Sequence, residues 1–143
     1  MKVRDVMTTK VQSVTPQTYL VTAARYMRDL NVGALPVVDN DQLLGIITDR
    51  DIVIRVVAEG KNPQNEQVQT YHTPSPSTIS PDDDLRDATD LMGRQQIRRL
   101  PVVENGTLVG FLSLGDVAVE GRDKVSGEAL EQISYPAEPH ISS

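Results

Sequence analysis

The sequence predicts an α/β (α+β) fold of two tandem β-α-β-β-α repeats, which we expect to pack sheet to sheet about a pseudo-twofold axis. Three observations predict it. The chain is self-similar at a constant offset, its 38% hydrophobic residues include only 3% aromatics, and its apolar patterns change repeatedly between helical and strand periods. A core of Val, Leu, Ile, Ala and Met is typical of aliphatic helix-on-sheet packing.

The repeat offset is 65 positions, as Pro16 and Pro81 show (81 − 16 = 65). Without any gap, it aligns Leu35-Pro36-Val37-Val38 with Leu100-Pro101-Val102-Val103. Other aligned pairs are Leu20 and Leu85, Ala23 and Ala88, Met27 and Met92, Asn40 and Asn105, Leu43 and Leu108, Gly45 and Gly110, and Asp51 and Asp116. A register this long indicates one structural unit written twice.

Each copy begins with a strand and a helix. Val11 to Val14 predicts a short strand that Pro16 ends. Apolar residues then recur at helical spacing, namely Leu20, Ala23, Ala24, Met27 and Leu30, with Leu85, Ala88, Leu91 and Met92 in the second copy. Thr18 and its counterpart Asp83 are the predicted N-caps of these helices.

A hairpin and a second helix complete each copy. Leu35 to Val38 and Leu43 to Thr48 read as antiparallel strands, and the twin turn carries Asn105-Gly106, which suits a tight hairpin. The strand before the helix should run parallel to the strand after it, because a crossover joins them. The last helix is expected from about Asp49 to Ala58, and its equivalent from about Leu114.

These elements predict a first repeat over residues 1–58, a polar linker over 59–67, a second repeat over 68–120 and a C-terminal tail over 121–143. The tail contains one short helical pattern, around Glu128 to Ile133. Repeats of roughly 55 to 60 residues are marginal for independent folding, so we expect the two to share their stability.

Composition excludes several function classes. The net charge of −6 argues against general nucleic-acid binding, which depends on Lys and Arg at phosphates. With no Cys and two His, disulfides, thiolate zinc sites and a histidine-only metal site are not expected. No stretch resembles a signal peptide or approaches the ~20 apolar residues of a membrane span, so we expect a cytoplasmic protein without membrane contact.

The motif that carries chemistry is [Ser/Thr]-x-x-Asp at the start of each last helix, Thr48 with Asp51 and Ser113 with Asp116. An Asp carboxylate there can accept both hydroxyls of a ribose, and the hydroxyl three residues earlier can add a third hydrogen bond. The same spacing is common in simple helix caps. The motif alone therefore leaves a nucleoside site and a cap as alternatives.

Together with their fixed spacing, these motifs identify a resemblance. Residues 1 to about 120 resemble a tandem pair of CBS domains (named after cystathionine β-synthase), also called a Bateman module. The residues that carry it are Val32-Gly33-Ala34-Leu35-Pro36-Val37-Val38, Gly45-Ile46-Ile47-Thr48, Asp51, Ile97-Arg98-Arg99-Leu100-Pro101-Val102-Val103, Gly110-Phe111-Leu112-Ser113 and Asp116. The architecture looks like that of small stand-alone bacterial or archaeal CBS-pair proteins.

The resemblance implies two clefts between the repeats, each with the ribose-binding Asp of one repeat. The cleft of Asp116 is expected to contain Val11, Gln12, Val32, Gly33, Arg98, Arg99, Phe111, Ser113 and Asp116. The cleft of Asp51 is expected to contain Gly33, Ala34, Ile46, Thr48, Asp51, Pro76, Ser77, Ile97 and Arg98.

The two clefts differ in charge. Arg98-Arg99 occupies the positions that contact phosphate in the family, where the first repeat has Gly33-Ala34. We expect tighter binding of a phosphorylated adenosine at Asp116, with Arg50 available to offset the difference at Asp51. The alternative is that the two arginines are a solvated pair at the end of a helix.

Two other features read as structural. His72 is expected to be a lone exposed histidine, and the run Asp82-Asp83-Asp84 is expected to complement the dipole of the helix that follows it.

The function that follows is a non-catalytic sensor that requires no cofactor and binds AMP, ADP or ATP, with NAD or S-adenosylmethionine as further options. Its expected partners are a second copy of the chain and an unidentified regulated protein. The alternative is a structural or protein-interaction module without a physiological ligand. A hydrolase or transferase lacks support, because no nucleophile with an adjacent base and no phosphate-binding loop can be named.

Apolar faces of the last helices, more extensive than one small sheet needs, predict a homodimer. These faces are formed by Ile52, Val53, Val56, Val57, Val117, Ala118 and Val119.

Overall fold

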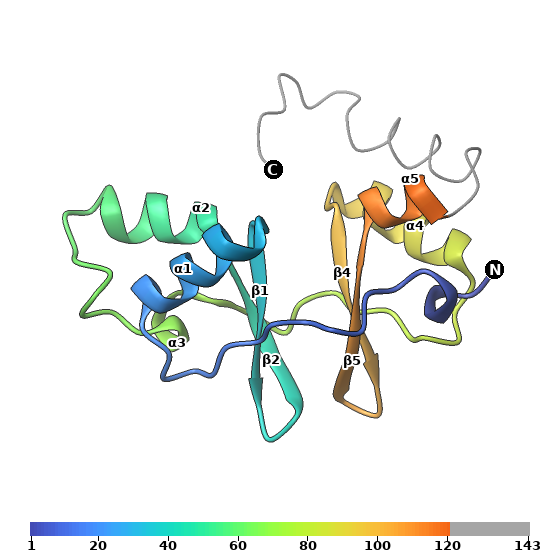
Figure 1. Ribbon diagram of the computed structural model, residues 1–143, viewed down its shortest axis with the longest axis horizontal. Coiled ribbons are helices and arrows are strands. Elements are labelled where there is room, and N and C mark those ends of the chain that lie inside the picture. The colour runs from blue at the N-terminus through green and yellow to red at the C-terminus, as the bar shows by residue number, and fades with distance from the viewer. Residues whose placement is uncertain (121–143) are drawn as a thin grey trace. The chain divides into compact units, whose positions relative to one another are not determined.

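The computed structural model describes residues 1–120, and the predicted tail of 121–143 with its helical pattern lies outside them. The chain forms two compact units (Figure 1). The first-repeat unit is Gln12–Pro76, and the second-repeat unit combines Met1–Val11 with the chain from Ser77 onward. The mixed helix and strand content confirms the predicted α+β class.

The first-repeat unit is a hairpin with helices before and after it. Its elements are α1 (Leu20–Leu30), β1 (Ala34–Asp39), β2 (Gln42–Thr48), α2 (Asp49–Ile52), a π-helix η2 (Val53–Val57), α3 (Val68–Tyr71) and β3 (Thr73–Pro74). β1 pairs antiparallel with β2 from Ala34↔Thr48 to Asp39↔Gln42. β3 adds to the other side of β2 through Gly45↔Pro74 and Ile46↔Thr73.

The second-repeat unit has the same central order of helix, two strands and helix. Its elements are η1 (Val3–Asp5), α4 (Leu85–Gln95), β4 (Arg99–Glu104), β5 (Thr107–Ser113) and α5 (Leu114–Glu120). Its hairpin runs from Arg99↔Ser113 to Glu104↔Thr107, which is the register of the first hairpin moved by 65 positions. Even the register irregularity recurs, at Val37/Val38 and Val102/Val103. The structure thus confirms the internal repeat.

The hairpin turns adopt the left-handed backbone that the Asn-Gly signal predicts. Asn105 and Gly106 have φ of 53° and 81°, and Asn40 and Asp41 have φ of 51° and 65°. Two consecutive residues at positive φ give the type I′ turn, whose twist matches that of antiparallel strands.

The predicted strand Val11 to Val14 is wrong in extent but right in direction. Only Val14 pairs, in a parallel bridge with Val37, and Ile79 does the same with Val102. The amide of Val14 donates to Pro36 O at 3.0 Å, and the amide of Val38 donates to Val14 O at 2.8 Å. The turn that begins at Pro16 then carries the chain away from the sheet, which limits the pairing to one residue.

The predicted N-caps are also wrong. Tyr19 and Asp84 occupy the cap positions. Thr18 Oγ1 instead accepts the amide of Thr15 at 3.0 Å, and Asp83 Oδ2 accepts the amide of Ser80 at 3.0 Å. Both side chains therefore stabilise the turn before the helix, a local hydrogen bond for which Thr and Asp are equally suited.

Each unit has its own aliphatic core. The predicted stripe of α1 is buried at Leu20, Ala23 and Met27, whereas Leu30 at its end is 51% exposed. The core of the first-repeat unit consists of Val14, Leu20, Ala23, Met27, Leu35, Val37, Ile47, Ile52, Val56, Val68 and Tyr71. The core of the second-repeat unit consists of Val3, Val6, Ile79, Leu85, Ala88, Met92, Leu100, Val102, Leu112, Leu114 and Val117.

Each core is completed by the segment that precedes the other repeat. Val3 and Val6 pack into the second-repeat core, while Val68 and Tyr71 fill the equivalent places in the first-repeat core. We call Met1–Val11 and Glu66–Pro76 the exchanged segments. Single repeats defined by sequence alone would lack these residues. The second-repeat unit is discontinuous in the chain, whereas the first-repeat unit is the continuous stretch Gln12–Pro76.

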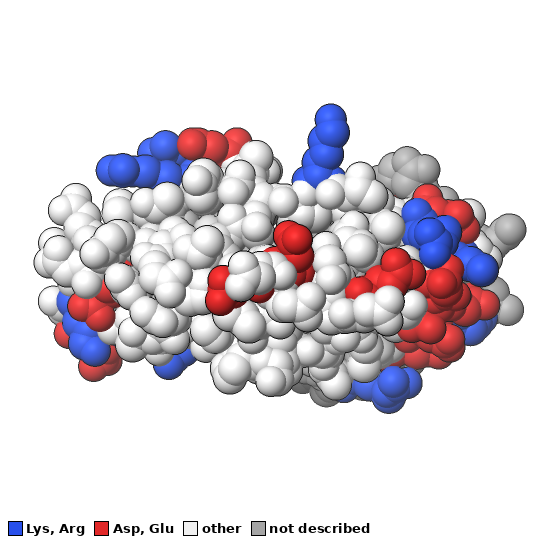
Figure 2. All heavy atoms as spheres, turned by 90° about the horizontal axis from the view of Figure 1, so that it is seen from below, with Lys and Arg blue, Asp and Glu red and all other residues white. Residues whose placement is uncertain are grey.

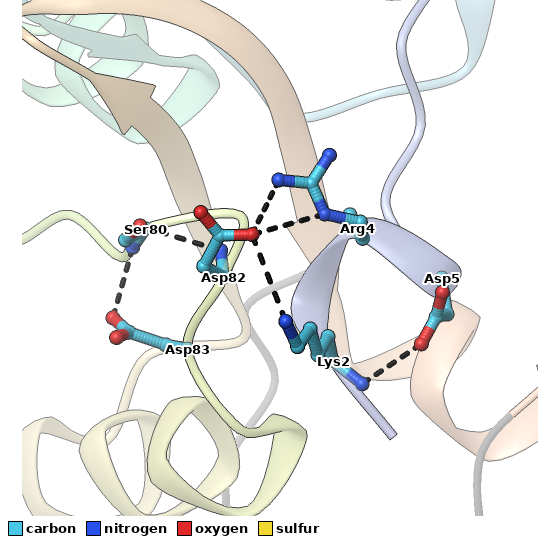
Figure 3. A network of polar contacts seen from close by, with 6 residues as sticks. All are labelled: Lys2, Arg4, Asp5, Ser80, Asp82 and Asp83. Carbon is cyan, nitrogen blue, oxygen red and sulfur yellow. Dashed lines mark hydrogen bonds and ion pairs between the residues drawn. The ribbon is translucent and has the colours of Figure 1, made fainter.

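Backbone and side-chain bonds hold the N-terminal exchanged segment. The amides of Val3 and Arg4 donate to Asp83 O at 2.9 Å and Pro81 O at 3.0 Å. The Arg4 guanidinium reaches Asp82 Oδ1, with Nε at 3.1 Å, and Lys2 Nζ lies 4.0 Å from the same oxygen (Figure 3). Asp82 is therefore an anchor for this segment rather than a dipole partner of α4.

Close backbone approach at Gly45 predicts a steric test. A Cβ at Gly45 would lie 2.5 Å from Thr73 O and from His72 Cδ2, whereas Gly115 has only Ser113 Oγ within 4 Å, at 3.8 Å. We expect Gly45→Ala to lower the free energy of unfolding by about 1–3 kcal/mol. The control Gly115→Ala, in α5, should be neutral or stabilise by up to about 1 kcal/mol. Urea denaturation compares them, and equal effects would contradict the close packing.

The Arg4–Asp82 contact predicts a pH dependence. Hydrogen bonds from Arg4 lower the pKa of the Asp82 carboxyl below its ordinary value, and charge attraction by Arg4 and Lys2 adds to this. Because the folded pKa is depressed, the stabilisation is present above the unfolded pKa and is lost as pH falls through the folded pKa. In an NMR titration, Arg4→Met should raise the pKa of Asp82. An unchanged pKa would show that the pair does not persist in solution.

Candidate functional site

The helix that follows each hairpin holds the predicted Asp in its first turn, Asp51 in α2 and Asp116 in α5. The amide of Asp51 donates to Thr48 Oγ1 at 3.1 Å, and Asp51 Oδ2 accepts the amide of Thr48 at 3.0 Å. The amide of Asp116 donates to Ser113 Oγ at 3.0 Å. These side chains therefore do cap their helices, as the alternative interpretation held.

Capping leaves the carboxylates with further capacity. A carboxylate offers about four lone-pair sites, and the cap of Asp51 uses one of them, on Oδ2. Its Oδ1 lies 4.0 Å from Arg55 Nη1, and the Asp51 side chain stays 17% exposed. The amide of Thr48 orients the Asp51 carboxylate, so the two interpretations of the motif are compatible.

The structure brings Thr8 to Asp116, which sequence reasoning missed. Thr8 Oγ1 donates to Asp116 Oδ2 at 3.4 Å. Two backbone bonds between Thr8 and Phe111, of 2.8 and 2.9 Å, hold the segment against β5. The repeat offset could have found it, because Thr8 aligns with Thr73, which pairs with Ile46 in the same way.

Arg98 and Arg99 lie beside the start of α5. Arg98 O accepts the amide of Leu114 at 2.7 Å, and Arg99 pairs with Ser113 across the hairpin. Both arginines are half-buried. They follow α4, which ends at Gln95, so they belong to the entry of β4. Their backbone places them next to the capped Asp, as a phosphate-contacting role requires.

Gly33 and Ala34 hold the equivalent places in the first-repeat unit. Gly33 O accepts the amide of Asp49 at 2.9 Å, and Ala34 pairs with Thr48. Around Asp51 this unit therefore offers no side-chain cation at these two positions. The exposed Arg50 is on the helix itself.

The remaining predicted residues divide between the units. Val11, Ser77 and Ile97 belong to the unit of Asp116, while Gln12, Val32 and Pro76 belong to the unit of Asp51. Two of them have local partners: Gln12 Nε2 donates to Ser13 O at 2.8 Å, and Ser77 Oγ donates to Gln95 Oε1 at 2.6 Å. Their participation in a site stays a prediction.

His72 is half-buried, so the prediction of an exposed histidine is wrong. Its ring covers Gly45, where the absence of a side chain makes room. Within residues 1–120 its Nδ1 is a buried side-chain atom without a hydrogen-bond partner.

The described residues offer neither a metal-binding cluster nor a membrane-spanning helix. In residues 1–120 no group of three or more His, Cys, Asp or Glu could hold a metal ion. Over the same range no helix is long and apolar enough to cross a bilayer.

Comparisons with known proteins agree with this geometry. The family model for the CBS domain matches residues 3–58 and 68–122. The CBS domain-containing protein YhcV of Bacillus subtilis is 43% identical over 134 residues, covering 93% of this chain and 95% of the relative.

Two solved structures have the same fold. Hypoxic Response Protein I with two coordinated zinc ions is 33% identical with a TM-score of 0.76, covering 83% of this chain and 98% of that one. CBSX2 in complex with AMP is 30% identical with a TM-score of 0.72, covering 82% and 93%. The chain therefore belongs to the CBS domain family, and its two CBS domains make it a regulatory module of the CBS-pair type.

Proposed function

We propose that the chain binds an adenine nucleotide through the capped carboxylates of Asp116 and Asp51 and acts as a sensor without catalysis. The observation that carries the proposal is the same helix-start geometry in both units, in which the amide of each Asp donates to the hydroxyl three residues earlier. The two hydroxyls of a ribose are donors, and an oriented carboxylate can accept both. Fixing the carboxylate beforehand lowers the entropic cost of binding.

The two sites differ in the ligand that they favour. Arg98 and Arg99 give the Asp116 site two guanidinium groups, which suit bidentate bonds to phosphate. At the Asp51 site Gly33 and Ala34 take these places. The Asp116 site therefore prefers the phosphorylated nucleotide, and the Asp51 site takes a less charged ligand or binds more weakly.

The residues that the structure describes favour a nucleotide over a metal ion. CBSX2 contains AMP, whereas Hypoxic Response Protein I contains zinc. A zinc site needs about four ligands from His, Cys, Asp or Glu, and residues 1–120 contain no such cluster. AMP, ADP and ATP are the first candidate ligands, followed by NAD and S-adenosylmethionine, and no cofactor is needed.

The surface fits a module that does not bind nucleic acid. On the face drawn in Figure 2, acidic and basic side chains lie close to one another, and much of the remaining surface is uncharged. The chain carries 20 acidic against 14 basic residues. Nucleic-acid binding requires a concentrated basic field, so a small nucleotide and a regulated protein are the better partners.

The compartment that we propose is the cytoplasm.

Calorimetric titration with AMP, ADP, ATP, NAD and S-adenosylmethionine tests the proposal. Losing hydrogen bonds to a charged group should weaken binding about tenfold or more at a ribose site. We expect Asp116→Ala to remove the tighter AMP site and Asp51→Ala to remove the weaker one. The affinities of adenosine for the two sites should differ less than the affinities of AMP do.

The matched control is Asp90→Ala, which removes a carboxylate from the middle of α4 rather than from the start of a helix. Binding of AMP that is lost in Asp51→Ala and retained in Asp116→Ala would overturn the proposed asymmetry. Absence of binding by every ligand would favour the alternative, a protein-interaction module. A parallel assay for nucleotide turnover should show no product, and turnover by the purified protein would contradict the non-catalytic role.

We further propose a homodimer, because the π-helix η2 of the first-repeat unit leaves apolar side chains exposed. Val53, Ile54 and Val57 are 53%, 47% and 53% exposed. The predicted faces are partly corrected: Ile52, Val56 and Val117 are used in the cores of their own units, and the side chain of Val119 lies outside the described residues. Neighbouring exposed apolar residues of this kind mark an interface between proteins.

Light scattering after size-exclusion chromatography tests the dimer. At micromolar concentration we expect twice the mass of 15.7 kDa, and Ile54→Asp should give a monomer because a charge would be buried at the interface. Leu30→Asp, at another exposed apolar position, is the control and should stay dimeric. A monomeric wild type would contradict the proposal.

A further inference from the structure

Arg55 lies one helical turn after Asp51, where it contacts two different parts of the first-repeat unit. Its Nη1 is 4.0 Å from Asp51 Oδ1. The same nitrogen donates to the backbone carbonyl of Tyr71 at 2.5 Å. One donor group is thus shared between the candidate ribose carboxylate and the exchanged segment Glu66–Pro76.

Tyr71 is the central residue of that segment. It is 5% exposed and belongs to the first-repeat core. Its hydroxyl donates to Glu66 Oε1 at 2.6 Å and accepts from Lys61 Nζ at 3.2 Å. The Arg55 guanidinium and the Lys61 ammonium each lie 5.5 Å from its ring centre, within cation-π range. Arg55 therefore binds a rigid part of the segment.

The helix around Arg55 is irregular. Val53–Val57 is a π-helix, in which the amide of Ala58 donates to Val53 O at 2.8 Å. π-helical turns are uncommon and occur frequently at functional sites.

The second repeat does not provide the same residues. At the offset of 65, Arg55 aligns with Glu120 and Tyr71 aligns with Val6. The sequence therefore repeats neither the guanidinium nor the ring, and the connection proposed below concerns the Asp51 site.

We propose that Arg55 is a positioning residue that couples the Asp51 site to the packing of the exchanged segment Glu66–Pro76. Asp51 and the Tyr71 carbonyl attract the same guanidinium. A ligand whose hydroxyls donate to Asp51 weakens the attraction of that carboxylate for Arg55, and the guanidinium then bonds more fully to Tyr71. Occupancy of the site tightens the segment that precedes the second repeat.

The ligand part rests on the nucleotide binding proposed above, but the coupling itself can be tested in the ligand-free protein. Amide hydrogen exchange reports the segment, because Val68, Gln69 and His72 donate to Thr18 O, Pro16 O and Val68 O at 2.9, 3.0 and 2.9 Å. The variants are Asp51→Asn, which keeps an acceptor for the cap, Arg55→Met, and the two together. Arg25→Met, which removes the same charge from an exposed position of α1 in the same unit, is the control.

We expect Arg55→Met to speed exchange at these amides about tenfold, because a hydrogen bond to a charged group is lost. Asp51→Asn should slow it about threefold, the scale of a surface ion pair, and should have no effect in the Arg55→Met background. Arg25→Met should leave exchange unchanged. Arg55→Lys, which keeps the charge, should fall between Arg55→Met and wild type, and it provides the comparison if Arg55→Met does not fold.

If Asp51→Asn changes the rate of amide hydrogen exchange equally in the wild type and in Arg55→Met, the coupling is overturned. Saturating AMP should slow exchange in the wild type and not in Arg55→Met. If AMP binds both proteins and changes exchange in neither, the nucleotide proposal stands and the coupling fails. If none of the five candidate ligands binds either protein, the nucleotide proposal fails, while the ligand-free variants still decide the coupling.

Discussion

The structure depends on the close approach of each exchanged segment to the second strand of a hairpin. At Gly45 and Gly110 a Cβ would collide with the segment, at 2.5 Å from Thr73 O in one unit and 3.0 Å from Thr8 O in the other. These contacts complete both cores, since Val3 and Val68 enter them from the same segments. A repeat of this size buries too little surface alone, which explains why each uses chain that precedes its twin.

The same approach builds the candidate sites. Because Thr8 pairs with Phe111, its hydroxyl lies within hydrogen-bond distance of Asp116. In the other unit the backbone carbonyl of Tyr71, two residues before Thr73, accepts a hydrogen bond from Arg55. Each carboxylate is therefore in contact, directly or through one side chain, with a segment that links the repeats. A module with this construction can convert occupancy of a carboxylate site into a change in that segment, provided that ligand binding differs between the two states.

Sequence reasoning predicted the features that one repeat encodes locally. Apolar spacing placed α1 and α4, Asn105-Gly106 placed a hairpin turn, and the paired [Ser/Thr]-x-x-Asp motifs placed both caps. It failed where the partner of a residue is distant in the chain. Thr18 and Asp83 were predicted as caps because Thr and Asp can accept a backbone amide equally well in a cap and in the turn before the helix. His72 was predicted to be exposed because its packing over Gly45 arises only when β3 pairs with β2.

The most direct test of the central claim is whether the carboxylate of Asp116 recognises the ribose diol. Calorimetry should compare AMP with 2′-deoxy-AMP on the wild type and on Asp116→Ala. If the carboxylate accepts both hydroxyls, the deoxy analogue should bind the wild type about tenfold more weakly, and the variant should bind both ligands weakly and equally. Equal affinity of the wild type for the two nucleotides would contradict the account.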